Sequence, residues 1–87
     1  MKVKVVLFSF LREKLGWKEK IVEVEGEKAT LEAILDKLPD LKEAILSSDI
    51  DSFLILVDGV NVRLLKLLKT EVKDGTEIAI FPPGGGG

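Results

Sequence analysis

The sequence predicts an α+β domain, a roll in which a mixed sheet of four to five strands carries one main helix on one face. Two observations lead to this fold class. Segments with the apolar alternation of strands flank a single stretch of helical periodicity, in the order β-β-α-β-β-β. The chain has 87 residues with 46% hydrophobic content, which suits one small domain. Because one helix covers only one face of a sheet, the opposite face is open to solvent or to a partner.

The chain is expected to open with a β-hairpin. Residues 2–8 form a β-rich run, a short helical segment over 11–15 ends at Gly16, and residues 20–24 supply the returning strand. The apolar run at 5–11 is too short to cross a membrane and is followed by charged residues instead of a small-residue cleavage site. We therefore expect a soluble, cytoplasmic protein.

The main helix is expected to begin after Thr30, whose hydroxyl suits an N-cap. Apolar side chains then recur at the i, i+3, i+4 and i+7 spacing of one helical face, namely at Leu31, Ile34, Leu35 and Leu38. Pro39 is expected to end this helix, because proline lacks the amide donor that a helix interior needs. One more helical turn is expected around Leu41, Ala44 and Ile45.

The second half of the chain is expected to be mainly β. Residues 53–57 form a strand, the pair Asp58-Gly59 predicts a tight turn, and residues 60–64 return as a short strand. The segment 65–70 is ambiguous, because its leucine-leucine-lysine pattern could form a helical turn.

The last strand is expected to run from Glu77 to Phe81, after the turn signal Asp74-Gly75. Side chains alternate between the two faces of a strand, so Glu77 shares its face with Phe81. In the first strand, Lys4 shares its face with Phe8 by the same rule. If the charged residues face water, the two phenylalanines form an exposed docking patch. The alternative is that a loop or the other end of the sheet covers them.

Charge and composition exclude several classes of function. The chain has 13 Lys and Arg against 15 Asp and Glu, and these charges are interspersed, so no basic nucleic-acid surface is expected. Cysteine and histidine are both absent. We therefore expect no disulfide, no thiol nucleophile, no metal site and no catalysis by the side chains of this chain.

The segment 82–87, Pro-Pro-Gly-Gly-Gly-Gly, is the most informative part of the sequence. Proline stops the last strand, and the glycines after it have no side chain to obstruct a passage. We therefore divide the chain into a folded domain over residues 1–81 and a flexible tail over residues 82–87. Fully extended, the tail spans roughly 20 Å, so its carboxylate could enter a narrow tunnel in a partner enzyme. The alternative is an inert glycine linker, but this segment follows directly on an apolar strand.

Four parts of the sequence carry a family resemblance. They are the opening segment 3–16, the helix start Thr30-Leu31, the strand and turn Val57-Asp58-Gly59, and the segment 73–83 followed by glycines. Together they resemble the small subunit of molybdopterin synthase, the MoaD-like branch of the ubiquitin-like β-grasp sulfur carriers. The Phe-Pro-Pro-glycine ending is the most specific part, and the resemblance covers nearly the whole chain. It implies a β-grasp fold and a sulfur carrier that is not itself an enzyme.

The resemblance also implies partners and site residues. An activating partner would use ATP to adenylate the C-terminal carboxylate, and a sulfur donor would convert the adenylate to a thiocarboxylate. The tail would then enter the large subunit of molybdopterin synthase, which passes sulfur to a pterin precursor of the molybdenum or tungsten cofactor. By resemblance Gly87 carries the sulfur, Gly86 gives clearance beside it, and Gly84 and Gly85 thread the tail. The residues implied in partner contacts are Phe8, Arg12, Phe81, Pro82 and Pro83.

Two other functions remain open at this stage. A ubiquitin-like modifier would transfer the same activated terminus to a lysine amine, and a non-activated interaction domain would leave the tail inert. The chain departs from the family pattern at Gly84 and Gly85, where other residues are usual, and these glycines raise the entropy lost when the tail is threaded. For Arg12 an ordinary solvated charge is an alternative. We expect a monomer when free, because self-association would block the docking patch.

Overall fold

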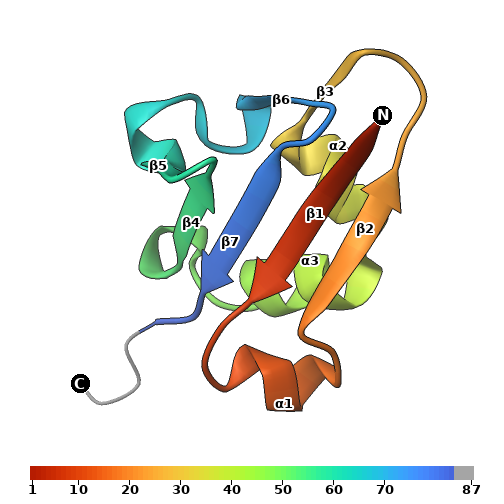
Figure 1. Cartoon of the computed structure of the whole chain (residues 1–87). Helices are drawn as coiled ribbons and strands as arrows, with labels where there is room; N and C mark the ends of the chain where they lie inside the picture. Colours follow the sequence, from red (N-terminus) through yellow and green to blue (C-terminus); the bar gives the residue numbers. More distant parts are fainter. Residues whose placement is uncertain (84–87) are drawn as a thin grey trace.

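The centre of the fold is a five-stranded mixed sheet with the order β2-β1-β7-β4-β5, seen in the computed structural model (Figure 1). The structure describes residues 1–83. The strands of this sheet are β1 (Lys2–Leu7), β2 (Glu19–Glu23), β4 (Leu54–Val57), β5 (Val60–Asn61) and β7 (Glu77–Phe81). A second sheet pairs β3 (Lys28–Thr30) with β6 (Glu71–Lys73). The predicted fold class, an α+β roll built on a mixed sheet, is confirmed.

The neighbouring strands β1 and β7 run parallel, and the other strand pairs within residues 1–83 are antiparallel. Alternate side chains of these two strands face the helices and form the centre of the core. They are Val3, Val5, Leu7, Ile78 and Ile80, and each has 0% exposure. Because successive side chains point to opposite faces, the residues between them form the outer face of the sheet.

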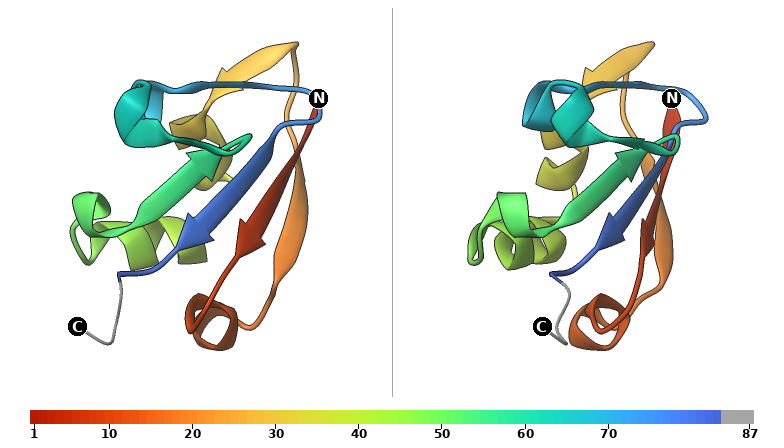
Figure 2. Two further views of the ribbon diagram at one scale, coloured as in Figure 1. Left: turned by 60° about the vertical axis from the view of Figure 1, so that its left-hand side comes forward. Right: turned by 90° about the vertical axis from the view of Figure 1, so that its left-hand side faces the viewer.

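The helices α2 (Leu31–Asp36) and α3 (Pro39–Leu46) lie on one side of the sheet (Figure 2). A short helix α1 (Leu11–Leu15) connects β1 to β2. As predicted, Thr30 caps α2, and its hydroxyl accepts a hydrogen bond from the Ala33 amide at 3.2 Å. None of the helices in the described part of the chain is long and apolar enough to span a membrane.

The main helix is shorter than expected, and the further turn expected after it is a full helix. It was expected to reach Leu38 and to be followed by one further turn, but α2 ends at Asp36 with 6 residues and α3 has 8. Pro39 accounts for the division, because it cannot continue a helix but suits the first position of the next one. Both helices pack on the sheet through buried apolar residues, namely Leu31, Ile34, Leu35, Leu41, Ala44 and Ile45.

The connection from β5 to β6 also differs from the expectation. The strand expected over 60–64 stops at Asn61, whose side chain accepts a hydrogen bond from the Arg63 amide at 2.9 Å. This bond caps the 3-10 helix η2 (Val62–Leu64), and a second 3-10 helix, η3 (Leu67–Lys69), precedes β6. The strands β3 and β6 were not predicted, because a strand of 3 residues is too short to show alternation.

Candidate functional site

The candidate site begins with an aromatic pair at the end of the two central strands. Leu7 of β1 lies opposite Ile80 of β7, and the Phe8 amide donates a hydrogen bond to the Ile80 carbonyl at 3.0 Å. The next residues, Phe8 and Phe81, therefore lie side by side. Their rings are stacked, with centroids 4.2 Å apart and an interplanar angle of 11°. Such a pair stabilises the fold beyond the area that it buries, by about 0.5–1.5 kcal/mol.

Arg12 of α1 extends this stack. Its Nε donates a hydrogen bond to the Leu7 carbonyl at 2.8 Å, and its guanidinium lies over the Phe8 ring, 5.2 Å from the centroid. Gly16 ends α1 in the left-handed region at φ +82°, and its amide donates to the Arg12 carbonyl. The backbone of Arg12 is thus fixed as well as its side chain. Arg12 is exposed, and among residues 1–83 its two terminal nitrogens make no hydrogen bond; a guanidinium is suited to bind a carboxylate or another anion.

The outer face of the sheet around the stack is apolar. Val6 of β1 and Leu56 of β4 both lie opposite Ala79 of β7, and Leu54 lies opposite Phe81. Side chains that lie opposite each other share a face and touch across the strands. We call this surface the tail-root patch; it consists of Val6, Phe8, Leu54, Leu56, Ala79 and Phe81. Leu54 is 40% exposed to solvent, and the other members are half-buried.

Charged pairs border the tail-root patch on the side of β2. The ammonium of Lys4 lies 3.0 Å from the Glu19 carboxylate, and that of Lys2 lies 3.5 Å from Glu23. The hydrogen bond from Lys4 to Glu19 raises the pKa of Lys4 above its ordinary value, and the negative charge of Glu19 acts in the same direction. These exposed pairs contribute little to stability. They give an apolar surface a polar rim, which is the usual arrangement of a protein interface.

The structure brings together three of the residues expected to contact partners, Phe8, Arg12 and Phe81. Both phenylalanines lie on the outer face, as strand parity predicts, but each is half-buried by the other. Pro82 and Pro83 follow directly and are also half-buried. The four remaining predicted positions, Gly84, Gly85, Gly86 and Gly87, lie outside the described residues.

Four members of the tail-root patch were not among the predicted site residues: Val6, Leu54, Leu56 and Ala79. For two of them a signal was present, because Val6 shares its strand face with Lys4, and Ala79 shares its face with Glu77. For the two leucines no charged residue within 53–57 marks a face, so their place on the outer face follows from the pairing of β4 with β7.

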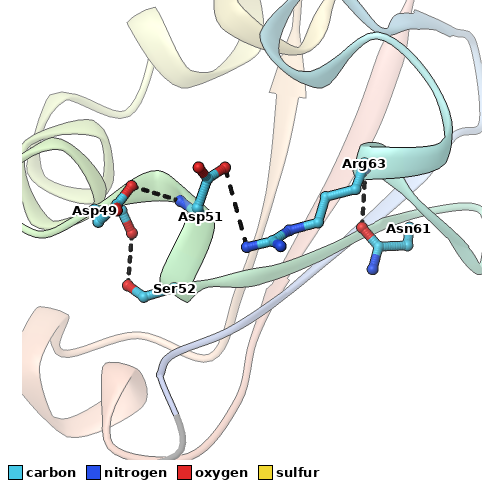
Figure 3. Close-up of polar contacts among 5 residues, drawn as sticks. All are labelled: Asp49, Asp51, Ser52, Asn61 and Arg63. Atoms are coloured by element: carbon cyan, nitrogen blue, oxygen red, sulfur yellow. Dashed lines mark hydrogen bonds and ion pairs between the residues drawn. The ribbon is translucent and has the colours of Figure 1, made fainter.

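A separate polar cluster has a structural role (Figure 3). Asp49 caps the 3-10 helix η1 (Ile50–Ser52), and its carboxylate accepts a hydrogen bond from the Asp51 amide at 3.0 Å. The guanidinium of Arg63 in η2 lies 4.0 Å from the Asp51 carboxylate and so links the two 3-10 helices. Across residues 1–83, no group of three or more His, Cys, Asp or Glu side chains is arranged to hold a metal ion.

Comparison with known proteins relates this geometry to a family. The ThiS family matches residues 5–87 of the chain. A protein of Archaeoglobus fulgidus assigned as a sulfur carrier is 36% identical over 73 residues, which cover 76% of this chain and 83% of the relative.

Solved structures have the same fold. Small archaeal modifier protein 1 (SAMP1) of Methanosarcina acetivorans is 40% identical, with a TM-score of 0.72 and coverage of 99% of this chain and 96% of that one. SAMP1 of Haloferax volcanii has a TM-score of 0.80, with 29% identity and coverage of 100% of both chains. A Pyrococcus furiosus protein assigned as subunit 1 of a molybdopterin converting factor has a TM-score of 0.69 and 26% identity, and the coverage is 95% and 98%.

These matches confirm the predicted ubiquitin-like β-grasp fold and the resemblance to the sulfur carriers. The family match begins at Val5 and covers the last three residues of β1, the whole tail-root patch and the glycines after Pro83. The chain therefore belongs to the ThiS family of ubiquitin-like sulfur carriers.

Proposed function

We propose that this chain is the small, sulfur-carrying subunit of molybdopterin synthase and acts in the cytoplasm, in synthesis of the molybdenum or tungsten cofactor. The observation that carries the proposal is the tail-root patch, an apolar surface at the point where β7 passes into Pro82 and Pro83. A partner docked on this patch is placed to receive the residues that follow Pro83. The likeness to the Archaeoglobus fulgidus protein assigned as a sulfur carrier, and to the Pyrococcus furiosus protein assigned as subunit 1 of a molybdopterin converting factor, supports the proposal.

The proposed chemistry takes place at the carboxylate of Gly87. An oxygen of this carboxylate attacks the α-phosphorus of ATP on an activating partner, pyrophosphate leaves, and an acyl-adenylate forms. Hydrosulfide from a sulfur donor then attacks the acyl carbon, the bond to AMP breaks, and a terminal thiocarboxylate results. In the large synthase subunit the thiocarboxylate sulfur attacks a carbon of the pterin precursor, the bond from that carbon to an oxygen leaving group breaks, and a thioester joins the carrier to the pterin. Hydrolysis of the bond between this sulfur and the acyl carbon restores the carboxylate.

In this proposal the chain positions its terminal carboxylate in the partner enzymes, and the partners provide the catalytic groups. Phe8 and Phe81 anchor the partner, because aromatic residues in a well-packed patch account for much of the binding energy of an interface. Arg12 pairs with a carboxylate of the partner through its terminal nitrogens. Gly84, Gly85 and Gly86 leave room for a narrow tunnel. The free carrier is a monomer and binds no cofactor of its own.

The test is a mass measurement on the intact protein after incubation with ATP, the activating partner and a sulfide donor. We expect the C-terminal residue to gain the mass that corresponds to replacement of one oxygen by sulfur. Without ATP no change is expected. The gain should disappear again when the large subunit and the pterin precursor are added, with sulfur recovered in the pterin. Adenylation without any subsequent thiocarboxylate would contradict the sulfur-carrier proposal.

A second candidate is a ubiquitin-like protein modifier, favoured by the 40% identity to SAMP1 of Methanosarcina acetivorans. In this case the amine of a target lysine attacks the acyl-adenylate, AMP leaves, and an isopeptide bond forms. Lys73 is the last lysine of the chain, so trypsin would leave residues 74–87 attached to a target lysine. Detection of this branched peptide in digests of the source cells would support the modifier function, and it would not exclude sulfur transfer.

A further inference from the structure

The segment 63–69, with the sequence Arg-Leu-Leu-Lys-Leu-Leu-Lys, connects β5 to β6 and is here called the leucine-lysine loop. It contains the 3-10 helix η3 and the end of η2. In Figures 1 and 2 it lies toward the end of the molecule away from the C-terminal end of β7. The function proposed for the tail therefore assigns no role to it.

Three of the four leucines in this loop point into solvent. The solvent-exposed fraction is 79% for Leu64, 45% for Leu65 and 42% for Leu67. Two residues anchor the loop to the domain. Val62 is buried, with an exposed fraction of 3%, and Leu68 packs against the core. Several exposed leucines within one short loop are uncommon on a surface that contacts only solvent.

The backbone holds these leucines in place. Leu67 lies in the left-handed region at φ +51°, which disfavours a residue with a side chain. The buried hydroxyl of Thr70 accepts a hydrogen bond from the Lys66 amide at 3.1 Å, and the Thr70 amide donates to the Leu67 carbonyl at 3.0 Å. The exposed leucines thus belong to a turn with internal hydrogen bonds.

Cations alternate with the exposed leucines. Arg63 faces Asp51, but Lys66 and Lys69 form no ion pair with any residue that the structure describes. Two open hollows share Lys66 and Lys69 in their walls, and exposed leucines line both of them. A ligand that complements this surface carries negative charges next to apolar side chains.

We infer that the leucine-lysine loop is a second docking surface, which binds an acidic, amphipathic segment of a partner protein. A protein segment fits better than an anionic bilayer, because a segment contacts the loop alone, whereas a flat bilayer also approaches other carboxylates of a chain whose net charge is −2. The loop is separate from the tail-root patch, so a partner held here leaves the start of the tail free. The inference does not depend on the chemistry proposed for Gly87.

The test is an NMR titration of the isotope-labelled full chain with a synthetic amphipathic peptide of glutamate and leucine. A second peptide with lysine in place of each glutamate tests the charge. We expect the acidic peptide to shift the amide signals of residues 63–69 and to bind more weakly as salt is raised. Leu64→Ser should reduce the affinity about tenfold or more, since it removes the most exposed leucine, whereas Ile21→Ser should not. Ile21 is the matched control, an apolar residue on β2 with 57% exposure.

The double substitution Lys66→Glu with Lys69→Glu should reverse the preference between the two peptides. The inference is wrong if the acidic peptide leaves the signals of residues 63–69 unchanged, or if both peptides bind equally well. Binding to phosphatidylglycerol vesicles in place of the peptide would assign the loop to a membrane and overturn it. Shifts of the same signals on concentration of the protein alone would assign the loop to a second copy of the chain, with the same consequence. Thermal unfolding of each variant checks that the fold is intact.

Discussion

At the scale of single residues, strand parity determines which aromatic side chains a partner can reach. Lys2 and Lys4 mark the outer face of β1, and this pattern was sufficient to predict the orientation of Phe8. The pattern could not predict that Phe8 stacks on Phe81, because the contact depends on the parallel pairing of strands from opposite ends of the chain. Nor could it predict that Arg12 lies over Phe8, which depends on the turn between β1 and α1.

Replacement of Phe8 by alanine should weaken partner binding more than it weakens the fold. The ring is half-buried, so we expect a loss of about 1–2 kcal/mol in the free energy of unfolding, below the range for a fully buried phenylalanine. As an interface anchor, the same ring should account for about 2 kcal/mol or more of the binding free energy. The two quantities are measured by chemical denaturation and by calorimetric titration with the activating partner.

Ile21→Ala is the control for this prediction, because Ile21 is exposed on the same face but lies on β2, outside the tail-root patch. It should change stability and binding by no more than about 0.5 kcal/mol each. Equal losses of stability and of binding in Phe8→Ala would assign Phe8 to the fold alone.

At the scale of elements, the boundary between α2 and α3 creates a contact that the sequence did not indicate. Asp40 lies in the first turn of α3, and its carboxylate accepts a hydrogen bond from the indole N–H of Trp17 at 3.0 Å. This bond lowers the pKa of Asp40 below its ordinary value, and a hydrogen bond from the Leu41 amide and the charge of Lys20 act in the same direction. The segment between α1 and β2 is thereby attached to α3.

We expect the contribution of Asp40 to stability to depend on pH. Because its pKa is lower in the folded chain than in the unfolded one, the stabilisation is complete above the unfolded pKa, near pH 4, and is lost as the pH falls through the folded pKa. Asp40→Asn should therefore be less stable than the parent at neutral pH, by less than about 1 kcal/mol for this exposed pair, and the difference should vanish in acid. Unfolding followed by circular dichroism at several pH values measures it. In a Trp17→Phe background the difference at neutral pH should be smaller, and an unchanged difference would show that Trp17 is not the cause.

Elements marked by a local pattern were predictable from sequence, and elements defined by pairing in the fold were not. The strands β1, β4 and β7 and the start of α2 at Thr30 follow from periodicity and capping, which are local properties. The strands β3 and β6 consist of 3 residues each and are defined by pairing with each other, so no local pattern marks them. The same applies to the segment 65–70, where left-handed Leu67 and the buried hydroxyl of Thr70 determine the backbone.

At the scale of the whole molecule, the strand order places the start of the tail beside an apolar surface. β7 is inserted between β1 and β4, so that Phe81 has Phe8 on one side and Leu54 on the other. The sequence predicted the aromatic residues of this surface, but the contribution of β4 required the topology. The leucine-lysine loop lies elsewhere on the molecule (Figure 1), so the two surfaces can be tested independently.

Removal of Gly87 should abolish the proposed function and leave the fold intact. The core is formed by residues that precede Pro82, and a glycine contributes no side chain to it, so the midpoint of thermal unfolding should not change. The shortened chain ends one residue too early for the sites that act on the carboxylate, and displacement of about 1 Å can already lower the rate of a positioned reaction roughly 100-fold. The measurement is ATP-dependent formation of the adenylate and of the thiocarboxylate. The matched control is Ile21→Ala, which keeps the length of the chain, lies outside the tail and the tail-root patch, and should retain most of the rate. If the chain without Gly87 were loaded with sulfur at the normal rate, the position of the terminal carboxylate would not matter and the proposed mechanism would be wrong.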